Sequence, residues 1–294
     1  MACVFRECDG IRVSGARRRS VPGARRGAGC VVPATARVAD LAACGWQAGG
    51  VLVAGFWGFV GGVALVLGAL LALARPFSAR TIGLVMAFGA GVLISALAFE
   101  LTEDAYDASG AREVVLGLAL GALTFYVGDR WLDRVGGRHR KRSSGVQAGP
   151  GGDAKGLVLG ALLDGIPESA AIGITLVGGK SVGVAVVAAV FLSNVPESMS
   201  AATGLRRAGH SPRWIIGLWT GVAVMSGVVA ALAYQLLGGS SPGVLAVIQA
   251  FAAGAILTML ADTMMPEAFE NGGPSVGLVT TTGFALAFLL SQVA

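Results

Sequence analysis

Residues 87–98 of the chain read AFGAGVLISALA, and residues 250–261 read AFAAGAILTMLA, at a constant offset of 163 residues. Each stretch lies in an apolar block of about 20 residues, the length of helix that crosses a hydrocarbon core. If the two blocks are the second and the seventh of a series, they cross the membrane in opposite directions. The likeness then predicts an inverted repeat, as in carriers whose halves are related by an axis in the membrane plane. The alternative is a chance likeness between two helices rich in alanine and glycine.

Apolar blocks of this length recur along the chain. Of its 294 residues, 54% are hydrophobic and 13% are charged, and the mean hydropathy is +0.73. Soluble domains carry about 25% charged residues, so lipid rather than water must surround most of this chain. We predict an all-α integral membrane fold with eight transmembrane helices, at residues 50–74, 81–101, 113–131, 155–178, 182–205, 213–237, 243–265 and 274–293.

Basic residues gather on one side of the predicted membrane. The connections after the first, third and fifth helices hold twelve lysines and arginines, whereas the opposite side has only Arg112 and Lys180. By the positive-inside rule, the basic connections are cytoplasmic. We therefore expect a multi-pass protein of the cell membrane with both termini on the non-cytoplasmic side. The net charge of +5 is explained by this topology, so we expect no nucleic-acid partner.

Two regions fall outside the predicted helices. Residues 1–45 are basic, hold all four cysteines and are expected to be an unstructured N-terminal segment or the product of an incorrectly assigned start codon. A disulfide or metal site in this segment remains an alternative. Residues 46–294 are expected to form the transporter domain, with a flexible, basic, cytoplasmic loop at 132–154.

Two similar motifs lie near the middle of the fourth and fifth predicted helices. They read DGIPES at residues 164–169 and SNVPES at residues 193–198. A proline inside a helix removes the hydrogen bond to the carbonyl four residues earlier. Pro167 and Pro196 are therefore predicted to break these helices and to expose polar backbone at mid-membrane depth.

The same motifs place carboxylates at mid-membrane depth. Asp164 and Glu168 are four residues apart and share a helix face, as do Ser193 and Glu197. Bare carboxylates at this depth are costly, and a divalent cation would neutralise them. Oxygen ligands without histidine or cysteine suit Mn²⁺, Fe²⁺ or Mg²⁺, and Zn²⁺ also accepts carboxylates. The alternative is that the two glutamates are protonated and hydrogen-bonded between helices.

Two further acidic residues lie near the helix ends. Glu100, on the second helix, and Asp262, on the seventh, either line the path of the ion or extend to the membrane interface. Glu103, Asp104 and Asp107 are expected to form an acidic outer loop, which either concentrates cations or is simply solvated.

Over residues 50–294 the sequence resembles the ZIP (Zrt/Irt-like) family of metal transporters. The resemblance rests on the two Pro-Glu motifs, which stand where the family has paired His-Asn-x-Pro-Glu-Gly motifs, on the eight-helix pattern, and on the Ala-Phe-x-Ala-Gly openings of the second and seventh helices. It implies uptake of Zn²⁺, Fe²⁺ or Mn²⁺ toward the cytoplasm by a protein that is commonly a homodimer. It also implies a metal site between helices four and five, made here by Asp164, Glu168, Ser193 and Glu197.

The sequence departs from the family pattern at the metal site. Asp164 replaces the usual histidine, and Ser193 replaces a histidine or glutamine. Gly165 stands where a family asparagine helps to hold a second metal, and Asn194 stands at the acidic or amide partner of that asparagine. We therefore expect a site for one ion, with Asn194 in a supporting or pathway role.

The function predicted from these observations is transmembrane transport of a divalent transition-metal cation, which is the substrate and not a cofactor. One alternative is a carrier of another cation, such as a small organic one. Another is a membrane sensor or scaffold that has the fold but does not transport. We do not expect an enzyme, because the helices hold no nucleophile paired with a base and no phosphate-binding motif.

Overall fold

The computed structural model describes residues 34–134, 155–177 and 183–292, with side chains from residue 49 in the first range and from residue 159 in the second. Residues 1–33 of the expected N-terminal segment and residues 135–154 of the expected loop lie outside these ranges. The helix bundle belongs to a compact unit, Ala43–Ala294. A second unit, Met1–Ala42, contributes only the start of helix α1 to the described residues.

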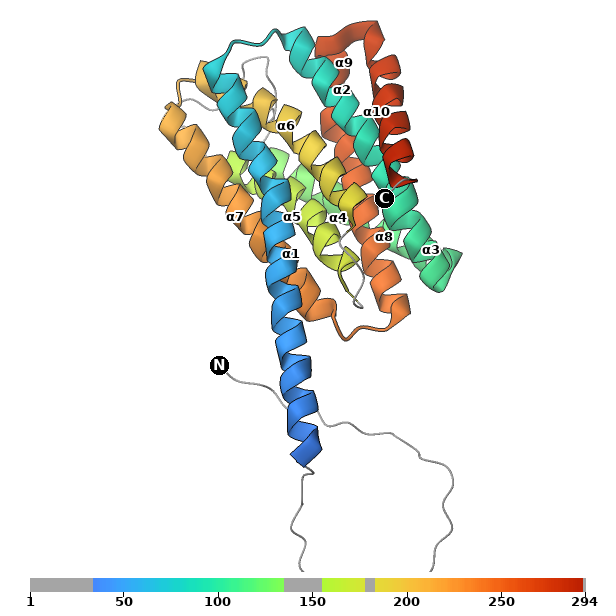
Figure 1. The fold of residues 1–294 in the computed structure, drawn as a ribbon. Helices are drawn as coiled ribbons and strands as arrows, with labels where there is room; N and C mark the ends of the chain where they lie inside the picture. The colour runs from blue at the N-terminus through green and yellow to red at the C-terminus, as the bar shows by residue number, and fades with distance from the viewer. Residues whose placement is uncertain (1–33, 135–154, 178–182, 293–294) are drawn as a thin grey trace, which may run out of the picture. The chain divides into compact units, whose positions relative to one another are not determined.

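All regular structure in the described ranges is helical, and no strand occurs there (Figure 1). This confirms the predicted all-α class. The α-helices are α1 (Ala34–Ala74), α2 (Ala79–Ala96), α3 (Glu103–Ser109), α4 (Ala111–Leu132), α5 (Lys155–Thr175), α6 (Val184–Arg207), α7 (Pro212–Leu237), α8 (Pro242–Met259), α9 (Met265–Gly272) and α10 (Val276–Ser291). Each of the eight stretches predicted from hydropathy corresponds to one of the longer helices.

Within the described residues, six stretches are long and apolar enough to cross a membrane. They are Gly49–Ala74, Ala79–Ser109, Ala111–Leu132, Val184–Arg207, Pro212–Leu237 and Pro242–Ser291. The last of these contains α8, α9 and α10, and the chain turns at Gly273, whose φ of 66° lies in the left-handed region that favours glycine. The architecture is that of an integral membrane protein.

The predicted repeat extends beyond the sequence likeness that revealed it. The offset of 163 residues relates the first residue of α2, Ala79, to the first residue of α8, Pro242. It also relates the last residues of the two helices, Ala96 and Met259. Each of these helices continues into a π-helical turn, Leu97–Thr102 after α2 and Leu260–Met264 after α8. The same offset relates the apolar stretch Gly49–Ala74 of α1 to α7. The two halves of the bundle therefore share their helix lengths and their irregularities.

Pairing between the halves follows the repeat. The most extensive helix contacts are those of α2 with α10 and of α4 with α8, which are equivalent pairs under the repeat. Glycines allow these backbones to approach closely. A Cβ atom at Gly91 would lie 1.9 Å from the carbonyl oxygen of Thr280, and a Cβ atom at Gly254 would lie 2.3 Å from that of Leu118. Small residues at helix contacts have this role in membrane proteins generally.

Helices α5 and α6 link the two halves along the chain, and each packs mainly on one of them. Helix α5 packs mainly on α7 and α8, whereas α6 packs mainly on α2. One hydrophobic cluster joins α2, α5, α6 and α8, and it includes Ala90, Leu93, Ile172, Val190 and Ala253. The polar motifs of α5 and α6 therefore lie among apolar side chains.

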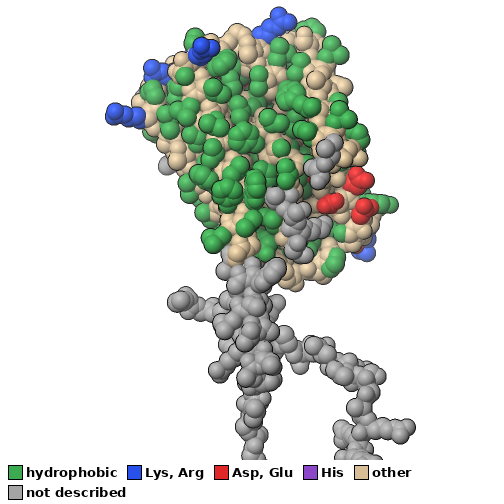
Figure 2. Space-filling view, in the orientation of Figure 1, with side chains coloured by type: hydrophobic (Ala, Val, Ile, Leu, Met, Phe, Trp, Pro, Cys, Tyr) green, Lys and Arg blue, Asp and Glu red, His purple; other side chains and the backbone are tan. Residues whose placement is uncertain are grey.

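On the face shown in Figure 2, charged side chains lie mainly at the two ends of the bundle, with an apolar band between them. One end carries Arg75 after α1, Arg80 at the start of α2, Arg206 and Arg207 at the end of α6 and Arg213 at the start of α7, all exposed. The other end carries Glu103, Asp104 and Asp107, also exposed. The expected acidic loop is in fact helix α3, because the π-helical turn after α2 carries the chain directly into it.

The close glycine contacts give a test of the packing. We expect Gly91→Ala and Gly254→Ala to lower the thermal unfolding midpoint in detergent, because overpacking of this kind costs about 1–3 kcal/mol. Gly221→Ala on α7 is the matched control, since no atom lies within 4 Å of its added Cβ. Alanine favours helix by up to about 1 kcal/mol over glycine, so the control should be as stable as wild type or more stable. Equal stability of all three variants would contradict the close packing.

Candidate metal site

The four predicted ligands are all buried on the two central helices. Asp164 and Glu168 on α5 are 1% and 2% exposed, and Ser193 and Glu197 on α6 are 0% and 4% exposed. Both pairs have the four-residue spacing that places side chains on one helix face. Buried apolar residues of the same two helices, among them Ile172 and Val190, belong to the hydrophobic cluster, so the carboxylates lie in an apolar part of the bundle.

Helices α5 and α6 run through Pro167 and Pro196 without interruption. The predicted helix breaks are therefore absent from the structure. Surrounding helices can hold a membrane helix together across a proline, because packing compensates for one missing hydrogen bond. A proline still cannot donate to the carbonyl four residues earlier, which is that of Leu163 in α5 and that of Leu192 in α6.

Asn194 is turned toward α1. Its Nδ2 donates a hydrogen bond of 3.1 Å to the carbonyl oxygen of Gly61. The neighbouring Ser193 donates its hydroxyl hydrogen to the carbonyl of Val190 in the same helix, at 3.0 Å. Asn194 therefore fixes α6 against α1, whereas the Ser193 oxygen keeps its lone pairs for a further partner.

Helix α2 forms the wall beside the α6 motif. A Cβ atom at Gly89 would lie 3.0 Å from Cα of Ser193 and 3.3 Å from Cγ of Pro196. Glycine at this position lets the backbone of α2 approach α6 beside the motif. The first half of the repeat therefore reaches the candidate site directly.

Among the residues that the structure describes, no three histidine, cysteine, aspartate or glutamate side chains are grouped closely enough to hold one metal ion. The four predicted ligands are all buried, two on α5 and two on α6. That they coordinate one ion together stays a prediction.

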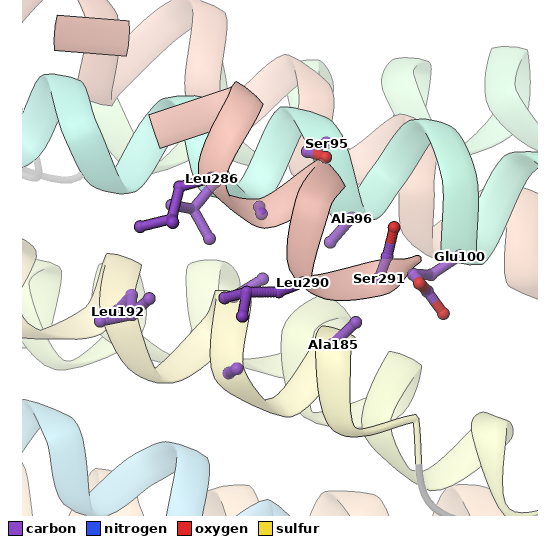
Figure 3. Close-up of a pocket in the computed structure, with 12 residues that line it drawn as sticks. Ser95, Ala96, Glu100, Ala185, Leu192, Leu286, Leu290 and Ser291 are labelled. Carbon is purple, nitrogen blue, oxygen red and sulfur yellow. The ribbon is translucent and has the colours of Figure 1, made fainter. Parts of the chain in front are cut away.

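Glu100 lines a small hollow between α2, α6 and α10 (Figure 3). Its walls are mostly apolar, and Ser95 and Ser291 are its other polar side chains. The hollow reaches Leu192, which directly precedes Ser193. Glu100 therefore lies beside a hollow whose wall adjoins the α6 motif at Leu192.

Asp262 has a different setting. It lies in the π-helical turn after α8 and is exposed on the surface of the bundle. Its electrostatic neighbours are Asp129 and Arg130 of α4. These neighbours place Asp262 beside α4. They are consistent with the alternative in which Asp262 extends to the membrane interface and does not line the path of the ion.

The structure also buries an acidic residue that the sequence analysis did not consider. Glu267 on α9 is 4% exposed, and its Oε1 accepts a hydrogen bond from the hydroxyl of Ser200 on α6, which is fully buried. The sequence signal was a third Pro-Glu pair, Pro266-Glu267, which repeats the pairs of the α5 and α6 motifs.

Comparison with models of protein families gives no match. Zinc transporter ZupT of Escherichia coli, from the O7:K1 strain IAI39 and from the K12 strain DH10B, is 31% identical to the chain over 242 residues. The aligned region covers 78% of this chain and 93% of ZupT. The chain belongs to the ZIP family of metal transporters.

A plant relative matches a shorter region. The protein named "Putative zinc transporter At3g08650" from Arabidopsis thaliana is 26% identical over 196 residues, which are 66% of this chain. The aligned region spans only 31% of that protein. This ZIP-family chain therefore corresponds to nearly the whole of the bacterial relatives but to about a third of the plant one.

The bond between Asn194 and Gly61 can be tested by stability. Asn194→Ala leaves the buried carbonyl of Gly61 without this donor, so we expect the unfolding midpoint in detergent to fall by the equivalent of about 1–3 kcal/mol. Ser198→Ala is the matched control, because the Ser198 hydroxyl donates only to carbonyls of its own helix, those of Asn194 and Val195. If the control loses as much stability as Asn194→Ala, the bond between α6 and α1 is not what holds the helices together.

Proposed function

We propose that the protein carries divalent transition-metal cations across the membrane toward the cytoplasm, and that Asp164, Glu168 and Glu197 hold the ion, with the Ser193 hydroxyl as a further ligand. The observation that carries this proposal is the burial of three carboxylates on the two central helices. The relatives support the transport function, because they are named as transporters and not as enzymes.

Charge supports a cation as the occupant. Intramembrane carboxylates are costly, by about 2.5–3.5 kcal/mol each on insertion scales, and they generally mark ion pathways. Within α5 and α6 the basic residues stand only at the helix ends, as Lys155, Arg206 and Arg207. A divalent cation between the two helices would offset much of the charge of the three carboxylates at mid-membrane depth.

The proposed ligands favour zinc, iron or manganese in a site for one ion. Carboxylate and hydroxyl oxygens accept Mn²⁺, Fe²⁺ and Zn²⁺, and the names of the relatives put Zn²⁺ first. Gly165 has no side chain to offer a second ion, and the amide of Asn194 bonds to the α1 backbone. Both observations support a single ion.

The proposed topology has eight crossings, with both termini on the non-cytoplasmic side. Helix α5 would add a crossing to the six apolar stretches, and the stretch Pro242–Ser291 would cross twice, by α8 and by α10. The basic connections at one end of the bundle support a cytoplasmic position for that end (Figure 2). The ion would then arrive from the acidic end through the hollow beside Glu100.

The repeat supports alternating access as the mechanism. In carriers with inverted repeats, one group of helices rocks against another around a central site. Helices α2 and α8 are equivalent under the repeat, and both pack on the central pair, α2 on α6 and α8 on α5. Movement of α5 and α6 against α2 and α8 would open the site first to the outside and then to the cytoplasm. The homodimer implied by the family resemblance stays a prediction.

Uptake of radioactive Zn²⁺, Fe²⁺, Mn²⁺ and Co²⁺ into proteoliposomes tests the proposal. Glu168→Gln and Glu197→Gln keep the size of each side chain and remove its charge, so we expect each to reduce uptake by more than about tenfold, equivalent to about 1.4 kcal/mol. Glu270→Gln is the matched control, because Glu270 is exposed on α9. Its uptake should equal that of wild type.

Two results would contradict the proposal. Unchanged uptake by folded Glu168→Gln and Glu197→Gln would remove these residues from the site. Absence of uptake of every ion by folded wild type would favour a carrier of small organic cations or a sensor without transport.

A further inference from the structure

The buried contact between Ser200 and Glu267 lies next to the proposed ligands on α6. Ser193, Glu197 and Ser200 follow the spacing i, i+4, i+7, so the three side chains lie along one face of the helix. All three are buried. Ser200 stands about 4.5 Å further along the helix axis than Glu197, at 1.5 Å per residue. The hydrogen bond to Glu267 then continues this polar row onto α9.

Glu267 lies between the proposed site and the basic end of the bundle. Helix α6 continues from Ser200 to Arg206 and Arg207 at that end. Helix α9 packs against the start of α2, where a Cβ atom at Gly83 would lie 3.1 Å from the carbonyl oxygen of Ala268. A cation that leaves Glu197 along the polar face of α6 would therefore meet the Glu267 carboxylate before it reaches the cytoplasm.

Glu267 is held in a defined position by its own helix. Asn271 Nδ2 donates a 3.0 Å hydrogen bond to the backbone carbonyl of Glu267, in the last turn of α9. Pro266 precedes Glu267 and fixes the backbone at the start of this short helix. The Ser200 hydroxyl donates to the carboxylate and orients it toward α6.

We propose that Glu267 is an inner ion-binding residue of the transport path, which receives the divalent cation from Glu197 on its way to the cytoplasm, and that Ser200 is its positioning residue. This inference rests on the proposed function. A carboxylate is a suitable ligand, because hard and borderline divalent cations bind carboxylate oxygen. A second carboxylate beyond the central site lowers the barrier to release, since the ion need not pass from three carboxylates directly into water.

A purely structural contact between α6 and α9 predicts different behaviour. Glu267→Gln keeps an oxygen that accepts the Ser200 hydrogen bond but removes the charge. Ser200→Ala keeps the charge but removes the bond. If the pair only ties the helices together, Ser200→Ala should be damaging and Glu267→Gln mild. If Glu267 binds the ion, the order of the two effects is reversed.

The test is initial-rate uptake of Zn²⁺ or Mn²⁺ into proteoliposomes over a range of ion concentrations. We expect Glu267→Gln to lower the maximal rate by about tenfold or more with little change in KM, because loading of the central site is intact. Ser200→Ala should keep most of the rate. Glu267→Asp, which retains the carboxylate, should recover part of it, and Glu270→Gln on the same helix should match wild type.

Each other outcome overturns the inference. Full activity of Glu267→Gln excludes a role for the charge, and loss of activity in Ser200→Ala together with an active Glu267→Gln identifies a structural tie. If Glu267→Gln does not fold, uptake by Ser200→Ala and Glu267→Asp still tests the inference. An inactive Ser200→Ala then excludes the ion-binding role of Glu267. Failure of the proposed function is distinguishable, because wild type itself would then transport no ion.

Discussion

The free-energy cost of holding carboxylates inside an apolar helix bundle constrains the rest of this structure. Asp164, Glu168 and Glu197 are buried on α5, which packs on α7 and α8, and on α6, which packs on α2. A charge in such a place needs a partner that the lipid cannot supply. The serines and asparagine of the same motifs donate hydrogen bonds to backbone carbonyls. A bound cation would offset the charge of the carboxylates.

The helices that surround these carboxylates approach one another closely at several glycines. Gly91 and Gly254 bring α2 against α10 and α8 against α4, and Gly89 brings α2 against the α6 motif. Van der Waals packing of small residues is the main attraction available between helices in lipid. Since the contacts in the two halves are equivalent, the bundle has two similar surfaces on which the central helices can rest. This equivalence is the structural basis for the proposed alternation.

The sequence predicted the helices well because hydropathy reports directly on burial in lipid. The ends of α4, α7 and α10 lie within a few residues of the predicted limits, since polar or turn-forming residues follow the apolar blocks. Helices α3 and α9 were not predicted, because they are polar enough to be taken for loops. The π-helical turns that lead into them from α2 and α8 were therefore not foreseen either. Side-chain periodicity predicts which face of a helix is polar, but it does not predict which neighbouring helix that face contacts.

For the candidate site, the sequence identified the buried residues of α5 and α6 but not their surroundings. Asn194 was expected in a supporting role, and its bond to Gly61 depends on a contact with α1, 133 residues earlier in the chain. Glu267 was missed for the same reason, since only the packing of α9 on α6 brings it to Ser200. Such contacts between distant segments carry no periodic signal in a single sequence.

The most direct test of the central claim is anomalous X-ray scattering at the zinc absorption edge, measured on crystals of the full chain with bound Zn²⁺. The account predicts an anomalous peak between α5 and α6, with oxygens of Asp164, Glu168 and Glu197 at about 2.0–2.2 Å, the distance usual for zinc and carboxylate. A peak found only elsewhere, for instance at the cysteines of the N-terminal segment, with none between α5 and α6, would contradict it.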